Sequence, residues 1–211
     1  MNNEENDPNV GDAPEPLSIP EVLKIDNYRW LWFGQAVSVA GDSMAHIALI
    51  LLINNLTGGS TQAIANLLIA LGLPMATIGL VAGVFVDRFP RRKIMIWSDI
   101  VRGLLVLAFV AFVLFGWTNI WYLYTFAFAH AVVNSFFSPA RQAITPTIIP
   151  TEGLMAANSL GQITMVLFAV IGTAIGGFIV GVFENYWVVF AIDAVTFFLS
   201  ALFISLSLIH I

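Results

Sequence analysis

A short basic segment between two long apolar runs constrains this chain most strongly. Residues 83–93 read GVFVDRFPRRK, with the apolar run 63–86 on one side and the apolar run 94–115 on the other. Each run is longer than the ~20 apolar residues that a helix needs to cross ~30 Å of hydrocarbon. Two such helices joined by so few residues form a hairpin, and the cations at its tip cannot enter lipid. The positive-inside rule therefore predicts that the tip lies in the cytoplasm.

The composition is that of an integral membrane protein. Hydrophobic residues make up 59% of the 211 residues and charged residues only 10%, which lies far outside the range of soluble domains. The formal net charge of -5 arises from acidic residues before the first apolar run, so we expect no nucleic-acid partner. The chain has no cysteine, which excludes disulfides and thiolate metal sites.

The apolar runs and turn signals predict an all-α integral membrane fold with six transmembrane helices. Both chain ends are then cytoplasmic, and every Lys and Arg falls in or near the cytoplasmic side. Pro74 predicts a kink in the second helix, and residues 139–155 are expected to form a loop. The expected helices are residues 30–56, 63–86, 94–115, 120–138, 158–183 and 187–209.

Two domains follow from this division. Residues 1–26 are rich in Asn, Glu, Asp and Pro, so we expect a disordered acidic cytoplasmic tail. Residues 27–211 form the six-helix transmembrane half-bundle. The similar segments 79–85 and 177–183 lie in helices of opposite direction, which favours an inverted three-plus-three repeat.

The basic segment also matches a known loop motif. The pattern Gly-x-x-x-Asp-Arg-x-x-Arg-Arg resembles the loop between helices 2 and 3 of the major facilitator superfamily, with Pro90 at the usual second glycine. Segments 27–42, 99–102, 137–146 and 156–159 resemble its drug and siderophore exporter branch, which includes macrolide-efflux and enterobactin-exporter proteins. The matching motif residues are Gly83, Asp87, Arg88, Arg91 and Arg92.

The resemblance implies a twelve-helix transporter of which this chain is the N-terminal half. The expected partners are a small-molecule substrate, the lipid bilayer, and either the missing C-terminal six-helix half or a second copy of the chain. Residues 206–211 resemble translated sequencing-adapter sequence, so we expect an artificial terminus after Ser205.

Polar residues follow one face of the first expected helix. Gln35, Ser38, Asp42 and His46 are spaced at i, i+3, i+7 and i+11, and such a face cannot point at lipid. At ~1.5 Å per residue Asp42 lies ~18 Å from Trp30, near mid-membrane, where an ionisable group is costly and by default functional. These residues are candidates for a substrate and proton path. The alternative is that Asp42 only accepts packing hydrogen bonds.

The fourth expected helix repeats this pattern with His130, Asn134, Ser138 and Arg141. The superfamily lines its central path with helices 1 and 4, so the resemblance implies that both polar faces meet at one cavity. We include His130 and Asn134 in the substrate and proton path. For His130 a hydrogen-bonded packing role is the alternative, and for Arg141 a topology-setting charge.

Asp99 and Arg102 are three residues apart, so they share a helix face and neutralise each other. The resemblance implies that this pair and Arg141 belong with the motif residues Gly83, Asp87, Arg88, Arg91 and Arg92 in a gating network at the cytoplasmic side. Loss of one charge there would leave its partner unpaired at low dielectric. Static packing is the alternative.

Residues 172–177 resemble an antiporter signature, Gly-Pro-x-x-Gly-Gly, in which Thr173 replaces the proline. We expect Gly172, Gly176 and Gly177 to allow close helix packing. Asp193 is an intramembrane acid for which the sequence gives no partner and no role.

The chain has no enzyme motif, no nucleotide-binding loop and no metal-binding pattern. We therefore expect no enzyme and no cofactor, with a proton gradient as energy source. The expected function is export of drug-like or siderophore-like small molecules by alternating access with proton antiport. One alternative is a lysophospholipid or nutrient facilitator without antiport, and another is a non-transporting membrane scaffold or a truncated fragment.

Overall fold

The computed structural model describes residues 15–207, and this part of the chain contains helices and no strand. Six helices are long and apolar enough to cross a membrane, as the sequence predicted. A short helix precedes them, and a 3-10 turn, Thr151–Gly153, lies between α5 and α6. The helices are α1 (Ile19–Val22), α2 (Asp26–Leu56), α3 (Thr61–Val86), α4 (Arg91–Leu114), α5 (Ile120–Ile148), α6 (Leu154–Phe183) and α7 (Tyr186–Ser207).

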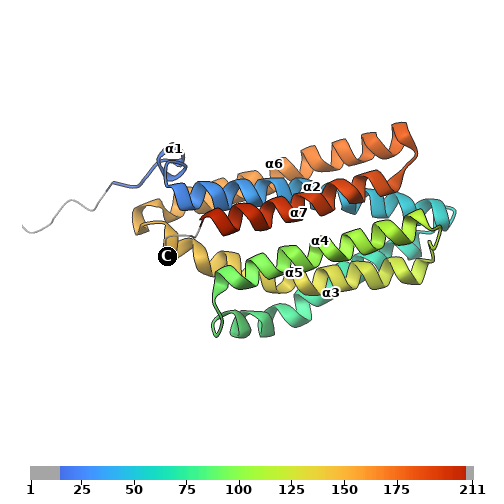
Figure 1. The fold of residues 1–211 in the computed structure, drawn as a ribbon, viewed down its shortest axis with the longest axis horizontal. Coiled ribbons are helices and arrows are strands. Elements are labelled where there is room, and N and C mark those ends of the chain that lie inside the picture. Colours follow the sequence, from blue (N-terminus) through green and yellow to red (C-terminus); the bar gives the residue numbers. More distant parts are fainter. Residues whose placement is uncertain (1–14, 208–211) are drawn as a thin grey trace, which may run out of the picture.

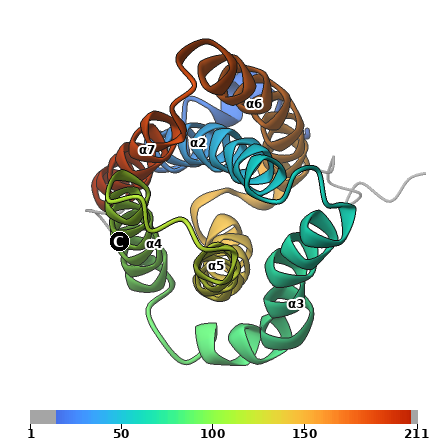
Figure 2. The same ribbon diagram turned by 90° about the vertical axis from the view of Figure 1, so that its right-hand side faces the viewer.

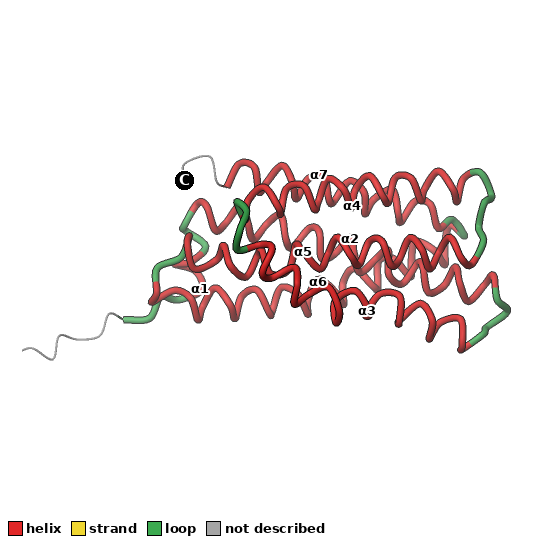
Figure 3. Tube along the Cα trace, turned by 90° about the horizontal axis from the view of Figure 1, so that it is seen from below, coloured by secondary structure: helices red, strands yellow, loops and turns green. Residues whose placement is uncertain are grey.

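The six long helices run side by side along the molecule (Figures 1 and 3). Helix α2 packs against α6 and α7, α4 packs against α7 and α5, and α3 packs against α5. Figure 2, viewed along the helices, has α3 and α6 as the outer members of this arrangement. The α2–α6 pair therefore corresponds to the α5–α3 pair, with α4 against α7 between them, which is the arrangement of an inverted three-plus-three repeat. We call the end of the bundle that carries the α3–α4 loop the basic end.

Helix α5 differs from its predicted end. A loop was expected from residue 139, but α5 continues through Pro139 and Pro146 to Ile148. Proline removes a helical hydrogen bond, yet membrane bundles tolerate it where neighbouring groups satisfy the freed backbone. Here Phe137, Ala140 and Ile144 form a buried face that packs with other helices, so tertiary packing overrides the local proline signal.

The start of the described chain also differs from the expected tail. Residues 1–14 of that tail lie outside the described residues, but the rest contains α1, whose Val22 is 0% exposed. Val22 packs with residues of the α5–α6 connection and of α6. The hydroxyl and the backbone N–H of Ser18 donate to the Glu21 carboxylate at 2.6 and 2.8 Å, which lowers the pKa of Glu21. Composition alone missed this segment because its apolar residues find their partners elsewhere in the chain.

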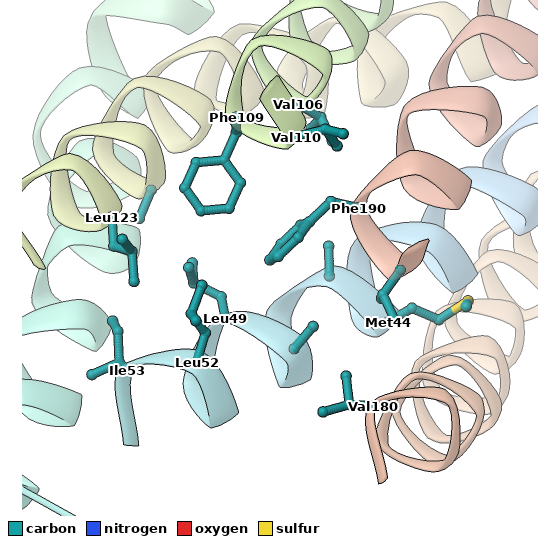
Figure 4. Close-up of a cluster of buried hydrophobic side chains, with 14 of the residues drawn as sticks. Met44, Leu49, Leu52, Ile53, Val106, Phe109, Val110, Leu123, Val180 and Phe190 are labelled. Atoms are coloured by element: carbon teal, nitrogen blue, oxygen red, sulfur yellow. The ribbon is translucent and has the colours of Figure 1, made fainter. Parts of the chain in front are cut away.

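The described residues form three apolar clusters: the one around Val22 and two along the six long helices. The larger of these two occupies the half away from the basic end, where Phe109 meets the edge of Phe190 at 4.8 Å between ring centroids (Figure 4). Phe109 also stacks on Phe126, with 4.1 Å between ring centroids. The smaller one lies at the basic end and includes Leu31 and Met95. Polar side chains of α2, α4 and α5 lie between the two clusters along their helices. The fold thus encloses a polar layer near the middle of a membrane-spanning bundle.

Candidate functional site

Five polar side chains from three helices meet in this layer, and we call them the central charge cluster: Asp42, Asp99, Arg102, His130 and Asn134. Arg102 connects most of them. Its Nη1 donates to Asn134 Oδ1 at 3.1 Å and to Asp42 Oδ2 at 3.4 Å, and its Nη2 pairs with Asp99 Oδ1. The Asp99–Arg102 pair is the one that the three-residue spacing predicted. Both residues are almost fully buried, so the pair holds charge where water does not compete.

Two aromatic rings hold the guanidinium of Arg102. Its central carbon lies 4.6 Å from the ring centroid of Phe137 and 4.3 Å from that of Phe197. A desolvated cation gains about 2 kcal/mol from such a ring face. The rings belong to α5 and α7, so sequence reasoning missed them: only the packing of these helices beside α4 brings them to Arg102. They restrict the directions in which Arg102 can reach a carboxylate.

Asp42 joins the Arg102 side of the cluster to a histidine. Its Oδ1 lies 3.6 Å from His130 Nε2, while its Oδ2 accepts from Arg102. His130 Nε2 is buried and has no hydrogen-bond partner within the described part of the chain. The side chain of Asp42 is 21% exposed, against 2% for Arg102. Asp42 is therefore a carboxylate with a fixed cation on one side, a titratable ring on the other, and an opening to solvent.

A cavity of about 130 Å³ opens on Asp42. The polar faces of α2 and α5 both line it, so the structure brings together the two stripes that the sequence placed on separate helices. Its polar lining comes from Gln35, Ser38, Asp42, Arg102, Asn134, Ser138 and Arg141.

A second cavity, of about 230 Å³, lies nearer the basic end. Gln35 and Arg141 line both cavities, and Arg141 Nη1 donates to Gln35 Oε1 at 3.1 Å. Tyr28 and Asn158 add further polar surface. The hydrogen bond between Gln35 and Arg141 thus lies between the Asp42 cavity and the basic end.

Asp193 and His46 lie on the other side of Asp42. A small pocket of about 10 Å³ is lined by Asp42, His46, His130 and Asp193 among others. Asp193 is 1% exposed, the Thr196 hydroxyl lies 3.3 Å from its Oδ1, and no ion pair within residues 15–207 includes it. Sequence reasoning assigned no role to Asp193, although a buried acid in a membrane span is itself a signal of function.

The charges of the basic end are separate from the central charge cluster. Arg91 Nη2 lies 3.7 Å from Asp87 Oδ1, and Arg91 Nη1 donates to the Ala143 carbonyl at 2.9 Å. Arg92 donates to the Ser205 carbonyl at 2.7 Å. The gating network expected as one unit therefore falls into separate groups in the described structure. Arg91 and Arg102 are about 16 Å apart along α4 at ~1.5 Å per residue, too far for one contact network.

The remaining expected site residues divide into packed and open positions. A Cβ on Gly172 would overlap the Ala40 carbonyl, and one on Gly176 would lie 2.7 Å from Met44 Cα. No such contact exists at Gly177 or at Gly83. Arg88 is exposed and forms no ion pair in the part of the chain described. Gly172 and Gly176 thus have the close packing that was expected of all three α6 glycines.

Comparison with known proteins identifies the family. A family model described as transmembrane secretion effector matches residues 20–208. Macrolide efflux protein A of Streptococcus pyogenes is 30% identical over 157 residues, which cover 73% of this chain and 38% of that protein. The uncharacterized transporter YkuC of Bacillus subtilis, of the major facilitator type, is 30% identical over 187 residues, 87% of this chain and 42% of YkuC.

A third relative is BacE of Bacillus subtilis, provisionally named a bacilysin exporter. It is 30% identical over 180 residues, which cover 85% of this chain and 43% of BacE. The chain thus spans about two-fifths of the length of the curated relatives it matches. No solved structure matches the chain.

The comparisons and the fold agree. Six membrane-length helices with an inverted repeat are what the N-terminal half of a major facilitator contains, and the resemblance found in the sequence is confirmed. Relatives that are transporters rather than enzymes agree with the expectation that the chain is no enzyme. The chain belongs to the transmembrane secretion effector family of the major facilitator superfamily, and it is a multi-pass membrane protein.

Proposed function

We propose that this chain is the N-terminal half of a secondary active exporter that moves drug-like or siderophore-like small molecules by alternating access with proton antiport. The observation that carries the proposal is Asp42, which lies between Arg102 and His130 and opens on a polar cavity. Relatives named for macrolide efflux and bacilysin export support an outward direction.

The proposal includes an orientation. In the described residues every Lys and Arg except Arg102 and Arg141 lies at the basic end, and Trp117 and Trp121 lie at the opposite end. Positive residues favour the cytoplasm and tryptophans favour membrane interfaces. We therefore assign the basic end, and with it both ends of the described part of the chain, residues 15 and 207, to the cytoplasmic side of the plasma membrane.

Proton coupling follows from competition at Asp42. As a carboxylate, Asp42 compensates part of the charge of Arg102 and faces His130. When a proton binds Asp42, its negative charge is lost, and among residues 15–207 Arg102 then keeps Asp99 as its one ion-pair partner. Since unpaired charge is costly at low dielectric, the cluster then favours a different arrangement. A polar or cationic substrate at the same cavity would compete with the proton, and this exchange couples export to the proton gradient without a cofactor.

The gate in this proposal is at the basic end. Arg91 and Arg92 connect the start of α4 to carbonyls of α5 and α7, and Asp87 pairs with Arg91. These contacts would hold the cytoplasmic side closed in the outward-facing state. Because the curated relatives are more than twice as long, the proposed partner is a second six-helix half or a second copy of this chain.

Efflux by the full-length protein in proteoliposomes with an imposed pH gradient tests the proposal. Asp42→Asn keeps the size of the side chain but cannot carry a proton, so proton-dependent efflux of a macrolide should be lost while the protein still reaches the membrane. Asp26→Asn is the matched control, because Asp26 is exposed and its one ion pair in the described structure is with Arg29 at the basic end.

The other outcomes separate the alternatives. Efflux by Asp42→Asn with an unchanged pH dependence would remove Asp42 from the mechanism. Transport by the wild-type protein without any pH dependence would favour a lysophospholipid or nutrient facilitator. No flux of any substrate from a well-folded protein would favour a membrane scaffold.

A further inference from the structure

A groove outside the transport path runs along the outer face of α3, α4 and α5 at the basic end. Its volume is about 440 Å³. Its walls are almost entirely apolar, and four of the eleven lining residues are aromatic. Phe85 stacks on Phe89 with 4.4 Å between ring centroids and meets the edge of Phe136 at 5.7 Å. The lining includes Phe85, Phe89, Lys93, Trp97, Val101 and Phe136.

The groove has the length of part of one lipid leaflet. Lys93, Trp97 and Val101 line it from successive turns of α4. At ~1.5 Å per residue these positions span about 12 Å, which fits within one half of a ~30 Å hydrocarbon core. Lys93 stands in the first turn of α4, at the polar end of the groove, and Val101 lies deeper in the membrane. The groove is therefore accessible to water at the end that Lys93 lines and apolar along the rest of its length.

Lys93 supplies the charge at the groove mouth. The neighbouring Arg91 and Arg92 are engaged with backbone carbonyls, and Arg91 also with Asp87. Lys93 is exposed, and no ion pair in the described structure includes it. Its ammonium thus keeps its donors for a ligand at the membrane surface. One turn deeper, Trp97 is 63% exposed, and tryptophan favours the interface between headgroups and acyl chains.

The opposite face of α4 carries Asp99 and Arg102, which are buried in the central charge cluster. The groove and the cluster therefore lie on different sides of one helix. A molecule in the groove would not be in the cavity that opens on Asp42. A lipid bound in the groove therefore occupies a different site from a molecule that is transported through the Asp42 cavity.

We propose that the groove binds an anionic phospholipid of the surrounding bilayer, with its phosphate on Lys93 and one acyl chain along Trp97 and Val101. A zwitterionic headgroup brings its own ammonium near Lys93, whereas a glycerol headgroup leaves the phosphate charge unopposed. Charge complementarity at the mouth selects the headgroup, and the apolar walls accept the chain. The site is independent of the transported substrate.

Fluorescence quenching in bilayers of the full chain tests this site. Two single-tryptophan proteins are prepared, one keeping Trp97 and one keeping Trp117, which is at the opposite end of the bundle and 60% exposed. Phosphatidylglycerol or phosphatidylcholine with brominated acyl chains is then added at low mole fraction. Trp97 should report about fivefold enrichment of the brominated phosphatidylglycerol, the preference expected for one lysine near an anionic lipid. Trp117 should report no headgroup preference.

Lys93→Gln should abolish the preference at Trp97, and Lys24→Gln, the removal of a distant cation at the same end, should leave it intact. Equal quenching of Trp97 by both lipids, or a preference that survives Lys93→Gln, would overturn the proposal. Native mass spectrometry provides a test without tryptophan replacements. The otherwise unaltered chain should retain phosphatidylglycerol more than Lys93→Gln does, and equal retention would count against the site.

Discussion

The pairs α2–α6 and α5–α3 correspond in the inverted repeat but are held together differently. Between α2 and α6 the backbones approach so closely that Gly172 and Gly176 leave no room for a Cβ. Two hydrogen bonds add to this contact: Trp32 Nε1 donates to Thr164 Oγ1 at 2.8 Å, and Tyr28 OH donates to the Ala157 carbonyl at 2.9 Å. The α2–α6 pair is therefore fixed by backbone proximity.

Between α5 and α3 no glycine of α3 lies against a neighbouring backbone, and side chains make the contacts. The contacts include the edge-on rings of Phe85 and Phe136 and a bond of 3.0 Å from Tyr124 OH to the Ala63 carbonyl. Gly72 and Gly83 of α3 have no atom within 4 Å of the position of a Cβ. Side chains can change rotamers where abutting backbones cannot. We therefore call the α2–α6 pair the rigid flank and the α5–α3 pair the adaptable flank. The adaptable flank carries Asp87 and part of the wall of the apolar groove.

The largest expected effect is at the rigid flank. Gly176→Ala would place its Cβ 2.7 Å from Met44 Cα, so the two helices must separate, at a cost of about 1–3 kcal/mol in stability. The midpoint of thermal unfolding in one detergent should fall. Gly177→Ala is the matched control, because no neighbouring atom lies within 4 Å of a Cβ added at Gly177 and alanine favours a helix. Equal midpoints for the two variants would contradict the close contact.

A smaller effect is expected from the hydrogen bond of the rigid flank. Thr164→Val keeps the shape of the side chain but removes the acceptor for Trp32, and such bonds contribute about 0.6 kcal/mol on average in membranes. The unfolding midpoint should fall slightly, and cysteine cross-linking between α2 and α6 should become less restricted. Thr173→Val, at an exposed position of the same helix, should change neither. A decrease of the same size at Thr173 would mean that the bond to Trp32 does not matter.

The smallest effect on stability, but a clear effect on conformation, is expected at the adaptable flank. The Asp87–Arg91 pair is exposed, so Asp87→Asn should change stability by less than ~1 kcal/mol. In the full-length protein it should release the end of α3 and shift the population toward inward-facing states. These 211 residues contain no cysteine, so with any cysteines elsewhere in the full-length protein replaced, Thr118→Cys provides a single reporter at the end opposite the basic end. Its labelling should slow in Asp87→Asn, and an unaltered rate would count against the gate.

Local patterns predicted much of the fold and part of the site. Six spans follow from apolar length, and the pairing of Asp99 with Arg102 follows from a three-residue spacing within one helix. Helical periodicity predicted the polar faces of α2 and α5, and the resemblance to the superfamily implied that both faces line one cavity. What these signals share is that they lie within a single helix or a known motif.

The rest of the site depends on contacts between distant residues. Arg102 reaches Asp42 and Asn134 across helix interfaces, and Phe197 covers it from α7. The course of α5 through Pro139 likewise depends on partners that a local rule cannot include. Single-helix patterns identify which residues are polar and buried, but the packing of the helices determines which of them meet.

The central claim is that Asp42 takes up and releases a proton in the middle of the bundle. Infrared difference spectroscopy of the reconstituted protein, between alkaline and acidic pH, measures the carbonyl stretch of protonated carboxyl groups directly. We predict a band at acidic pH that is absent from Asp42→Asn and retained in the Asp26→Asn control. Identical difference spectra for the wild-type protein and Asp42→Asn would contradict the account.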